Sequence, residues 1–327
     1  MSQSAPYPGV RPTHATISCV IPALNECDNL QILLPALEQL FQTLDLQYEL
    51  VVVNDGGTDA TAHWAQSWSP TSSRRYIELS RNFGKEAALS AGLQVCQGDA
   101  VIFLDADMQH PPQLIEHMLE RWRAGCDMVY AVRSSRDDEP IFKRWGSDLF
   151  YRILGRGSRV RIPPHAGDFR LMDRKVVQAL LQLPERTRFM KGLYAWVGFR
   201  SEAVTYTPPP RLHGYSHFNR LKLIRLALDG ITAFSTWPLM MLTGVGAVVA
   251  ALSFAYGLYI VLEFVFVGNP VSGWVTLATS ILFFSGINLL GLGVLGTYVA
   301  RIFDEVKQRP LYVVKHDSGL KALEPLS

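Results

Sequence analysis

Asp99-Ala100-Val101-Ile102-Phe103-Leu104-Asp105-Ala106-Asp107-Met108-Gln109-His110-Pro111-Pro112 is the stretch of this chain that decides its fold. The apolar run 101–104 predicts a strand that is buried on both faces. Asp105 and Asp107 are two residues apart, so their side chains point the same way on an extended backbone. The two prolines end the strand and suit the first turn of a helix. We therefore expect both carboxylates, with the amide oxygen of Gln109, at the carboxyl end of a core strand, where open α/β sheets bind ligands.

These hard oxygen donors suit Mg²⁺ or Mn²⁺, together with the diphosphate that such ions usually carry. A polar turn capped by an aspartate explains the same residues without any ligand, because short motifs have many false positives. The choice between a metal site and a simple turn depends on the remaining sequence.

Composition excludes several classes of protein. The chain has 327 residues, with 31 Lys and Arg against 29 Asp and Glu, so its formal charge of +2 does not predict a nucleic-acid partner. Its four cysteines are scattered without a C-x-x-C pair, which is typical of reduced thiols and not of a zinc site. Residues 1–14 form a tail rich in Pro and Ser that lacks the apolar core of a signal peptide, so we expect a cytosolic N-terminus.

Strands and helices alternate through the first half of the chain. Strands are expected at 16–22, 49–53, 76–79, 100–104 and 128–132, and helices at about 28–41, up to 68, 85–96 and 112–124. This alternation predicts a parallel, doubly wound sheet. Polar groups end three strands and would rim one crevice: Asn54-Asp55, Arg81-Asn82 and Asp105-x-Asp107. A further helix at 174–183, a helical stretch from 188 and a weakly alternating edge strand at 200–206 complete a domain that we place at 15–207.

The second half of the chain indicates a membrane protein. Segments 237–267 and 274–300 are almost unbroken apolar runs, and each exceeds the ~20 residues that a spanning helix needs. Lys and Arg flank this hairpin in the juxtamembrane segment 208–236 and the tail 301–327, but the connecting loop has none, so both ends are expected in the cytoplasm. Glycines at 246, 286, 291, 293 and 296 would allow close helix contact. Residues 141–155 predict a basic amphipathic helix at a membrane surface, although a helix packed on the sheet fits the same pattern.

Four blocks of sequence, at 19–26 (CVIPALNE), 53–59 (VNDGGTD), 80–85 (SRNFGK) and 104–111 (LDADMQHP), resemble in order and spacing the GT-A polyprenyl-phosphate glycosyltransferases of family 2. This family includes dolichyl-phosphate mannose synthase and the bactoprenol glucosyltransferases. The later blocks 167–171 (GDFRL) and 188–192 (RFMKG) match the same family, so the resemblance covers about residues 15–310. Agreement of several independent blocks makes it specific.

The resemblance implies a GT-A nucleotide-sugar-binding domain on a bacterial inner-membrane anchor, and an inverting transfer of sugar to undecaprenyl phosphate. By similarity, the nucleotide sugar contacts Pro22, Ala23, Asn25, Glu26, Asp55, Arg81, Lys85, Asp105 and Ala106. Asp107 and Gln109, with Asp105, would hold Mg²⁺ or Mn²⁺, which would act as a Lewis acid on the departing diphosphate. Asn25 and Asp59 also fit plain helix caps. The membrane-anchored relatives associate into homo-oligomers.

The acceptor phosphate is expected to bind Arg133, Lys143, Arg144, Ser147, Arg188, Lys191 and Arg211. Asp168 matches the family's proposed base, with Asp107 as the second catalytic carboxylate. A lipid phosphate with a second pKa of about 6 is already nucleophilic at neutral pH, so we expect Asp168 to orient the sugar or an arginine as much as to take a proton. A loop-capping Asp168 is the structural alternative.

The chain departs from the family pattern at two positions. Gly57 stands where Ser is usual, which removes a hydroxyl contact, and His217 stands where Lys is usual. A His near its reference pKa of about 6.5 carries only partial charge, so His217 predicts a pH-dependent contact with the lipid phosphate.

Three functions remain open from sequence. The first is the transfer described above, with UDP-glucose expected and UDP-GlcNAc, an aminoarabinose donor or GDP-mannose as alternative donors. The second is a processive polysaccharide synthase, which usually has more spans and a Q-x-x-R-W block that this chain lacks. The third is a non-catalytic membrane scaffold, which the intact Asp105, Asp107, Gln109 and Asp168 disfavour.

Overall fold

The computed structural model describes residue 11 and residues 14–68, 73–133, 163, 166–186, 188–207, 237–267 and 273–319. These residues form two compact units. The first contains the sheet, its helices and the segment that follows residue 308, and the second contains the two long helices.

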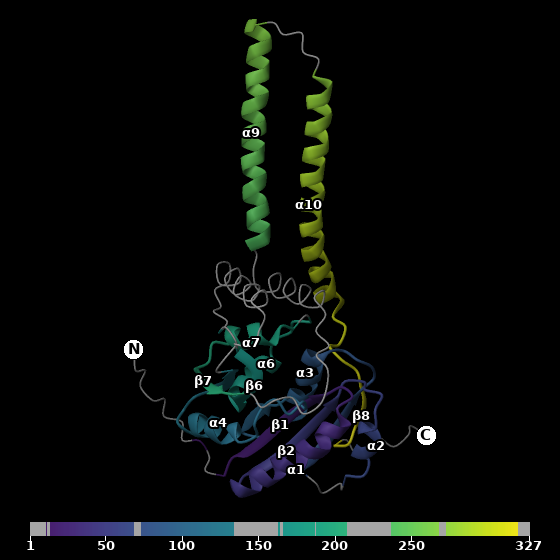
Figure 1. The fold of residues 1–327 in the computed structure, drawn as a ribbon, viewed down its shortest axis with the longest axis vertical. Helices are drawn as coiled ribbons and strands as arrows, with labels where there is room; N and C mark the ends of the chain where they lie inside the picture. The colour runs from purple at the N-terminus through teal and green to yellow at the C-terminus, as the bar shows by residue number, and fades with distance from the viewer. Residues whose placement is uncertain are drawn as a thin grey trace. The chain divides into compact units, whose positions relative to one another are not determined.

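The first unit alternates strands and helices as the sequence predicts (Figure 1). In chain order, its elements are β1 (Thr16–Ala23), α1 (Cys27–Thr43), β2 (Gln47–Asn54), α2 (Thr61–Ala65), β3 (Arg74–Leu79), α3 (Lys85–Val95), β4 (Ala100–Phe103), α4 (Leu114–Arg123), β5 (Met128–Arg133), β6 (Ala166–Asp173), α6 (Arg174–Leu181), α7 (Met190–Trp196), β7 (Ser201–Tyr206) and β8 (Val314–Asp317).

The eight strands form one mixed sheet in the order β7-β5-β6-β4-β1-β2-β3-β8. The expectation of an all-parallel sheet is wrong in two places, because β6 runs antiparallel to both β4 and β5, and β8 runs antiparallel to β3. The sequence concealed both strands: β6 carries charged residues within its apolar pattern, and β8 is short and polar. The edge position predicted for 200–206 is confirmed by β7.

Helices cover both faces of the sheet, as a doubly wound fold requires. On one face, α1 and α4 bury residues such as Leu34 and Trp122 in a single apolar cluster with β1, β2 and β4. On the other face, Gly92 of α3 lies directly against the Val20 side chain, where an added Cβ would overlap it. Each large apolar side chain buried in this way contributes roughly 1.5–3 kcal/mol. The packing therefore fixes the carboxyl ends of β1, β2 and β4 along one edge of the sheet.

The second unit consists of α9 (Trp237–Val267) and α10 (Trp274–Lys307), which lie side by side (Figure 1). Both contain segments long and apolar enough to cross a membrane, at Leu239–Ile260 and Phe283–Lys307, and neither segment is buried within the protein. These helices fit a membrane-anchored protein. Of the glycines expected at their contact, Gly291 lies 3.6 Å, measured from an added Cβ, from Leu242, whereas Gly246, Gly286, Gly293 and Gly296 face open space.

Candidate active site

The loop after β4 presents the two aspartates that the sequence singles out. Met108 has a left-handed backbone with φ of 58°, and the Gln109 amide donates to Asp107 Oδ1 at 3.2 Å. This Asx turn reverses the chain directly after the strand. Gln109 and His110 are buried, and the His110 ring packs 4.9 Å from that of Phe169. The loop is thus an ordered structure held on the sheet.

Lys85, the first residue of α3, joins a carboxylate from the loop after β4 to a carboxylate of β6. Its Nζ lies 2.7 Å from Asp105 Oδ1 and 2.8 Å from Asp168 Oδ2. The strand register explains the meeting, because Phe103 of β4 pairs with Arg170 of antiparallel β6 and so brings the two aspartates opposite each other. The structure therefore unites three residues that the sequence assigned to nucleotide binding and catalysis.

The charges of this cluster set the protonation state of Asp168. Burial alone would raise its pKa, but the nearby Lys85 and Lys191, with Arg170, outweigh burial and lower the pKa to about 2. Glu86, beside Lys85, shows the opposite balance. Burial and the charge of Asp168 raise its pKa to about 7 against the Lys85 charge and a hydrogen bond from the Met190 amide. Asp168 is consequently ionised at neutral pH, whereas Glu86 titrates there.

Asp55 at the end of β2 organises the loop that leads to Lys85. Its carboxylate accepts hydrogen bonds from the amides of Phe83 at 2.8 Å and Gly84 at 2.9 Å. Burial raises the pKa of Asp55, and these two hydrogen bonds oppose the rise. Gly56 has φ of 68° and touches the backbone of residues 81–82, so only glycine fits there. Its nucleotide contact stays a prediction, as does that of exposed Arg81, whose guanidinium lies 3.9 Å from the ring of Phe83.

The contacts of Asn25 and Asp59 show which of these two residues caps a helix, a point that the sequence left open. Asn25 has φ of 59°, and its Oδ1 accepts from the amides of Thr58 at 2.7 Å and Asp59 at 3.2 Å, so it braces the β2 loop instead of capping α1. Asp59 is the cap: it accepts from the first amide of α1, on Cys27, at 2.9 Å and from Thr61 at 3.1 Å. A Cβ on Gly57 would approach Asn25 Oδ1 to 2.9 Å, so a side chain there would require Asn25 to shift.

The donor set fits a divalent cation that also takes ligands from a substrate. Burial raises the pKa of Glu26, and Asp107, Asp59 and Asp105 raise it further, so negative charge gathers around Glu26. Pro22 and Ala23 end β1, and Ala106 lies between the two aspartates in the loop after β4. Among the described residues, no three His, Cys, Asp or Glu side chains come close enough to form a complete metal cage. Mg²⁺ is usually held by one or two carboxylates and substrate phosphates. Asp105, Asp107 and the amide of Gln109 match that partial set.

Only some of the residues expected to bind the lipid phosphate lie in the described part of the chain. Arg188 donates to the carbonyl of Leu183 at 2.8 Å and to Ser90 Oγ at 3.2 Å, so the protein already engages its guanidinium. Lys191 lies on α7 near Asp168, and Arg133 ends β5. Lys143, Arg144, Ser147, Arg211 and His217 lie outside the described residues.

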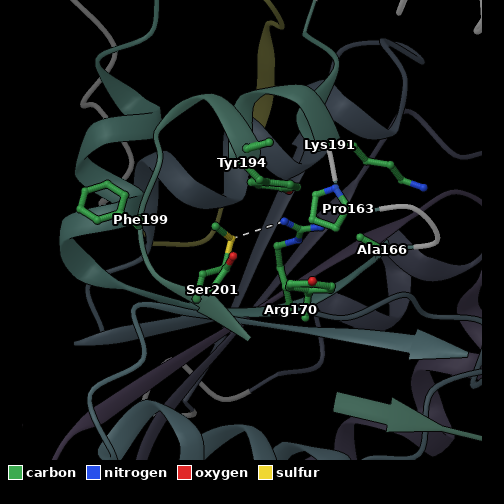
Figure 2. Close-up of a pocket in the computed structure, with 10 residues that line it drawn as sticks. Pro163, Ala166, Arg170, Lys191, Tyr194, Phe199 and Ser201 are labelled. Carbon is green, nitrogen blue, oxygen red and sulfur yellow. Dashed lines mark hydrogen bonds between the residues drawn. The ribbon is translucent and has the colours of Figure 1, made fainter. Parts of the chain in front are cut away.

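A small cavity beside this cluster contains a residue that the sequence analysis missed. It measures about 90 Å³ and is lined by Arg170, Lys191, Tyr194 and neighbours from β5, α7 and β7 (Figure 2). Arg170 is only 3% exposed, and its guanidinium lies 3.4 Å from the ring centroid of Tyr194. A charged residue between Phe169 and Leu171, both fully buried, was the available signal.

The sequence profile of glycosyl transferase family 2 matches residues 18–181. The chain belongs to glycosyltransferase family 2. This family 2 glycosyltransferase is 46% identical over 308 residues to an uncharacterized glycosyltransferase of Synechocystis. The matched region covers 94% of this chain and 97% of the relative. It is 44% identical over 301 residues to the SfII prophage-derived bactoprenol glucosyl transferase of Shigella flexneri, over 91% of this chain and 97% of that one. The bactoprenol glucosyl transferase of Shigella phage SfV is 43% identical over 303 residues, 92% of this chain and 98% of that one.

Solved structures similar to this family 2 glycosyltransferase share less sequence. Mannosyl-3-phosphoglycerate synthase from Rubrobacter xylanophilus has a TM-score of 0.46 and 20% identity, over 67% of this chain and 72% of that chain. Glucosyl-3-phosphoglycerate synthase from Mycobacterium tuberculosis, in complex with Mn²⁺, UDP-glucose and phosphoglyceric acid, has a TM-score of 0.45 and 21% identity, over 67% and 78%. The family expected from the sequence is confirmed by the profile and by the relatives that match nearly the whole chain.

Proposed function

We propose that this chain is a metal-dependent, inverting glycosyltransferase that moves glucose from UDP-glucose to undecaprenyl phosphate at the bacterial inner membrane. The observation that carries the proposal is the 44% identity to a bactoprenol glucosyl transferase over 97% of that relative's length. The match covers 91% of this chain, too much to leave out the region of the two apolar helices, so it supports the membrane-bound acceptor as well as the catalytic domain. The basic flanks of α9 and α10 support a cytoplasmic catalytic domain and termini. Association into a homo-oligomer stays a prediction.

In the proposed reaction, a phosphate oxygen of the lipid attacks the anomeric carbon from the face opposite the UDP group. The new carbon–oxygen bond forms as the bond to the β-phosphate breaks, which inverts the anomeric configuration. The lipid phosphate has a second pKa of about 6, so at neutral pH it is already largely dianionic and needs little deprotonation. The chain's task is therefore to bring two anions together and to stabilise the departing diphosphate.

Lys85 and Asp168 perform the positioning in this proposal. The ammonium of Lys85 lies between Asp105 and Asp168, where it neutralises charge beside the leaving diphosphate. Asp168, with its low pKa, orients Lys85 and the sugar, and accepts hydrogen bonds without taking a proton. A divalent cation held by Asp107, Gln109 and Asp105 would supply Lewis-acid neutralisation of the diphosphate.

A panel of radiolabelled nucleotide sugars, incubated with membranes that contain the protein, tests the proposal. Transfer of label from UDP-glucose into a lipid fraction is expected, and it requires added Mg²⁺ or Mn²⁺. Transfer from UDP-GlcNAc, an aminoarabinose donor or GDP-mannose instead would correct the donor. A polymeric product would favour a processive synthase, and no release of nucleotide with or without polyprenyl phosphate would favour a scaffold.

Asp107→Asn tests the metal assignment in the same assay. Loss of this carboxylate should reduce transfer on the order of 10²- to 10³-fold and raise the Mn²⁺ concentration needed for half-maximal rate. Glu120→Gln is the matched control, because Glu120 lies on α4 with a side chain 65% exposed, and should act like the wild type. An Asp107→Asn variant with unchanged metal dependence would remove Asp107 from the metal site.

A further inference from the structure

Asp168 lies in a bulge of β6, opposite the end of β5. The strands pair at Tyr130 with Arg170 and next at Val132 with Ala166, so β6 has three residues where β5 has one. Gly167 and Asp168 are thus outside the regular ladder, and β4 has already ended on the other side. Bulges of this kind redirect a side chain, and they need another partner for the backbone groups that they release.

Arg170 supplies that partner. Its Nη2 donates to the carbonyl of Gly167 at 2.7 Å, directly before Asp168. The guanidinium stacks on Tyr194, whose ring centroid is 3.4 Å away (Figure 2), and its Nη1 donates to the sulfur of Met128 at 3.4 Å. A planar donor that is stacked on a ring and hydrogen-bonded at a second nitrogen fixes the peptide that it contacts more firmly than a flexible ammonium would.

Stability alone does not explain this arginine. Arg170 is buried, and within the described part of the chain no carboxylate accepts a hydrogen bond from it and its Nε has no partner, so only the nearby charges of Asp168 and Glu86 offset its own. Burial of a cation is costly unless it is paired, and replacement of buried charges by apolar residues of similar size is often neutral or stabilising. A core built only for stability would favour Met or Leu at this position.

We infer that Arg170 is a positioning residue, which holds the β6 bulge in the shape that directs the Asp168 carboxylate to Lys85. In this role it acts through its hydrogen bond to the Gly167 carbonyl. The inference rests on the proposed function, in which Asp168 and Lys85 act in sugar transfer. It extends that function by giving a role to Arg170, to which neither the resemblance nor the predicted site assigns one.

The test compares Arg170→Met and Arg170→Lys with wild type in the full-length protein, using the donor that the wild type accepts. For Arg170→Met we expect kcat to fall on the order of 10- to 100-fold, because small displacements of reacting groups have effects of this size. The KM for the donor and the affinity for UDP, measured by calorimetric titration, should stay within threefold, and the thermal midpoint should stay equal or rise. Arg170→Lys should lose at least about fivefold in kcat, because Lys lacks the planar donor.

Arg174→Met is the matched control. Arg174 is the first residue of α6, directly after β6, and its Nε donates to the Gly98 carbonyl at 2.7 Å. It should lower the thermal midpoint and leave kcat per folded molecule unchanged. If both Arg170 variants fold and keep kcat within twofold, the inference is wrong, and if neither variant folds, Arg170 is a structural residue and the inference is equally wrong. If only Arg170→Lys folds, the inference is wrong when the kcat of that variant stays within twofold of wild type. Absence of transfer by the wild type itself would instead contradict the proposed function.

Discussion

Lys85 Nζ lies 2.8 Å from Asp168 Oδ2, so the first residue of α3 and the bulge of β6 meet across 83 residues of sequence. The same ammonium lies 2.7 Å from Asp105. One cation therefore links the carboxylate after β4 to the carboxylate of β6. Because Lys85 and its neighbours lower the pKa of Asp168 to about 2 despite burial, Asp168 is a weak proton acceptor at neutral pH.

The first prediction concerns Asp168→Asn. The amide keeps the size of the side chain and removes the charge that holds Lys85, so we expect transfer to fall on the order of 10²-fold. The ratio of variant to wild-type rate should be equal at pH 6, 7.5 and 9, because Asp168 is ionised across that range. Initial rates of UDP release give this ratio. Because the lipid phosphate titrates in the same way with both proteins, its titration does not affect the ratio. A loss that is severe at low pH and recovers at high pH would instead identify Asp168 as a general base.

The second prediction concerns Lys85→Met. Loss of the Lys85 ammonium leaves Asp105 and Asp168 as two facing anions, so we expect the rate of transfer to fall on the order of 10- to 100-fold. Lys175→Met is the control, because Lys175 forms a similar 2.7 Å pair with Asp127 on a side chain that is 50% exposed. Exposed pairs contribute little, so Lys175→Met should stay within about twofold of wild type. Equal effects of both substitutions would show that Lys85 has no special role in the reaction.

The sequence predicts the strands whose apolar pattern is uninterrupted. β2 and β4 are apolar where they cross the core, and β1 is interrupted there only by the small Ser18, so the existence of these strands and their polar ends could be predicted. β6 was missed as a strand, because Asp168 and Arg170 break the apolar run within it. β8 was missed because four residues rich in charge form a strand only when they pair with β3.

The residues of the site could be predicted individually, but their partners could not. Asp105 and Asp168 were both singled out, yet Lys85 bridges them only because β6 runs antiparallel beside β4. Asp59 caps α1 from a segment 32 residues away, a contact that no local pattern contains. The pKa difference between Asp168 and Glu86 likewise depends on burial and on charges from separate elements, which spacing along the chain does not encode.

The third prediction is a pH dependence of stability caused by Glu86. Its pKa is about 7 in the folded protein, through burial and the Asp168 charge, against about 4.5 when unfolded. The folded state therefore binds more protons between these values, and the stability contribution is lost as pH rises from about 4.5 to 7. Glu86→Gln removes this loss and should stabilise the protein by on the order of 1–3 kcal/mol at pH 8, with little change at pH 4.5.

Chemical denaturation of wild type and Glu86→Gln at pH 4.5, 6, 7 and 8 measures the effect. The contribution of Asp168 does not overlap with it, because a lowered carboxyl pKa stabilises above about pH 4 and is lost only as the pH falls toward 2. Parallel stability curves for the two proteins would mean that Glu86 is ionised throughout and that its burial is compensated by its neighbours.

The fourth prediction concerns Asp317, which fastens β8 to the edge of the sheet. Its carboxylate accepts from Arg75 Nε at 3.0 Å and Nη2 at 2.8 Å, and the next residue, Ser318, accepts from the Tyr76 amide at 2.8 Å. Burial would raise the pKa of Asp317, but the Arg75 hydrogen bonds lower it. Asp317→Ala should cost roughly 1–3 kcal/mol and release β8 from β3.

Hydrogen exchange at the Tyr76 amide is the sharpest measurement of that release, because the amide loses its partner only if β8 detaches. Exchange there should accelerate on the order of 10- to 100-fold in Asp317→Ala, while amides of β1 in the centre of the sheet stay unchanged. Lys315→Ala, which breaks the exposed pair with Glu78, is the matched control and should leave Tyr76 protected. Unchanged exchange at Tyr76 in Asp317→Ala would mean that backbone pairing alone retains β8. Accelerated exchange would establish that a single, partly buried ion pair closes an edge that would otherwise be open to pairing with another chain.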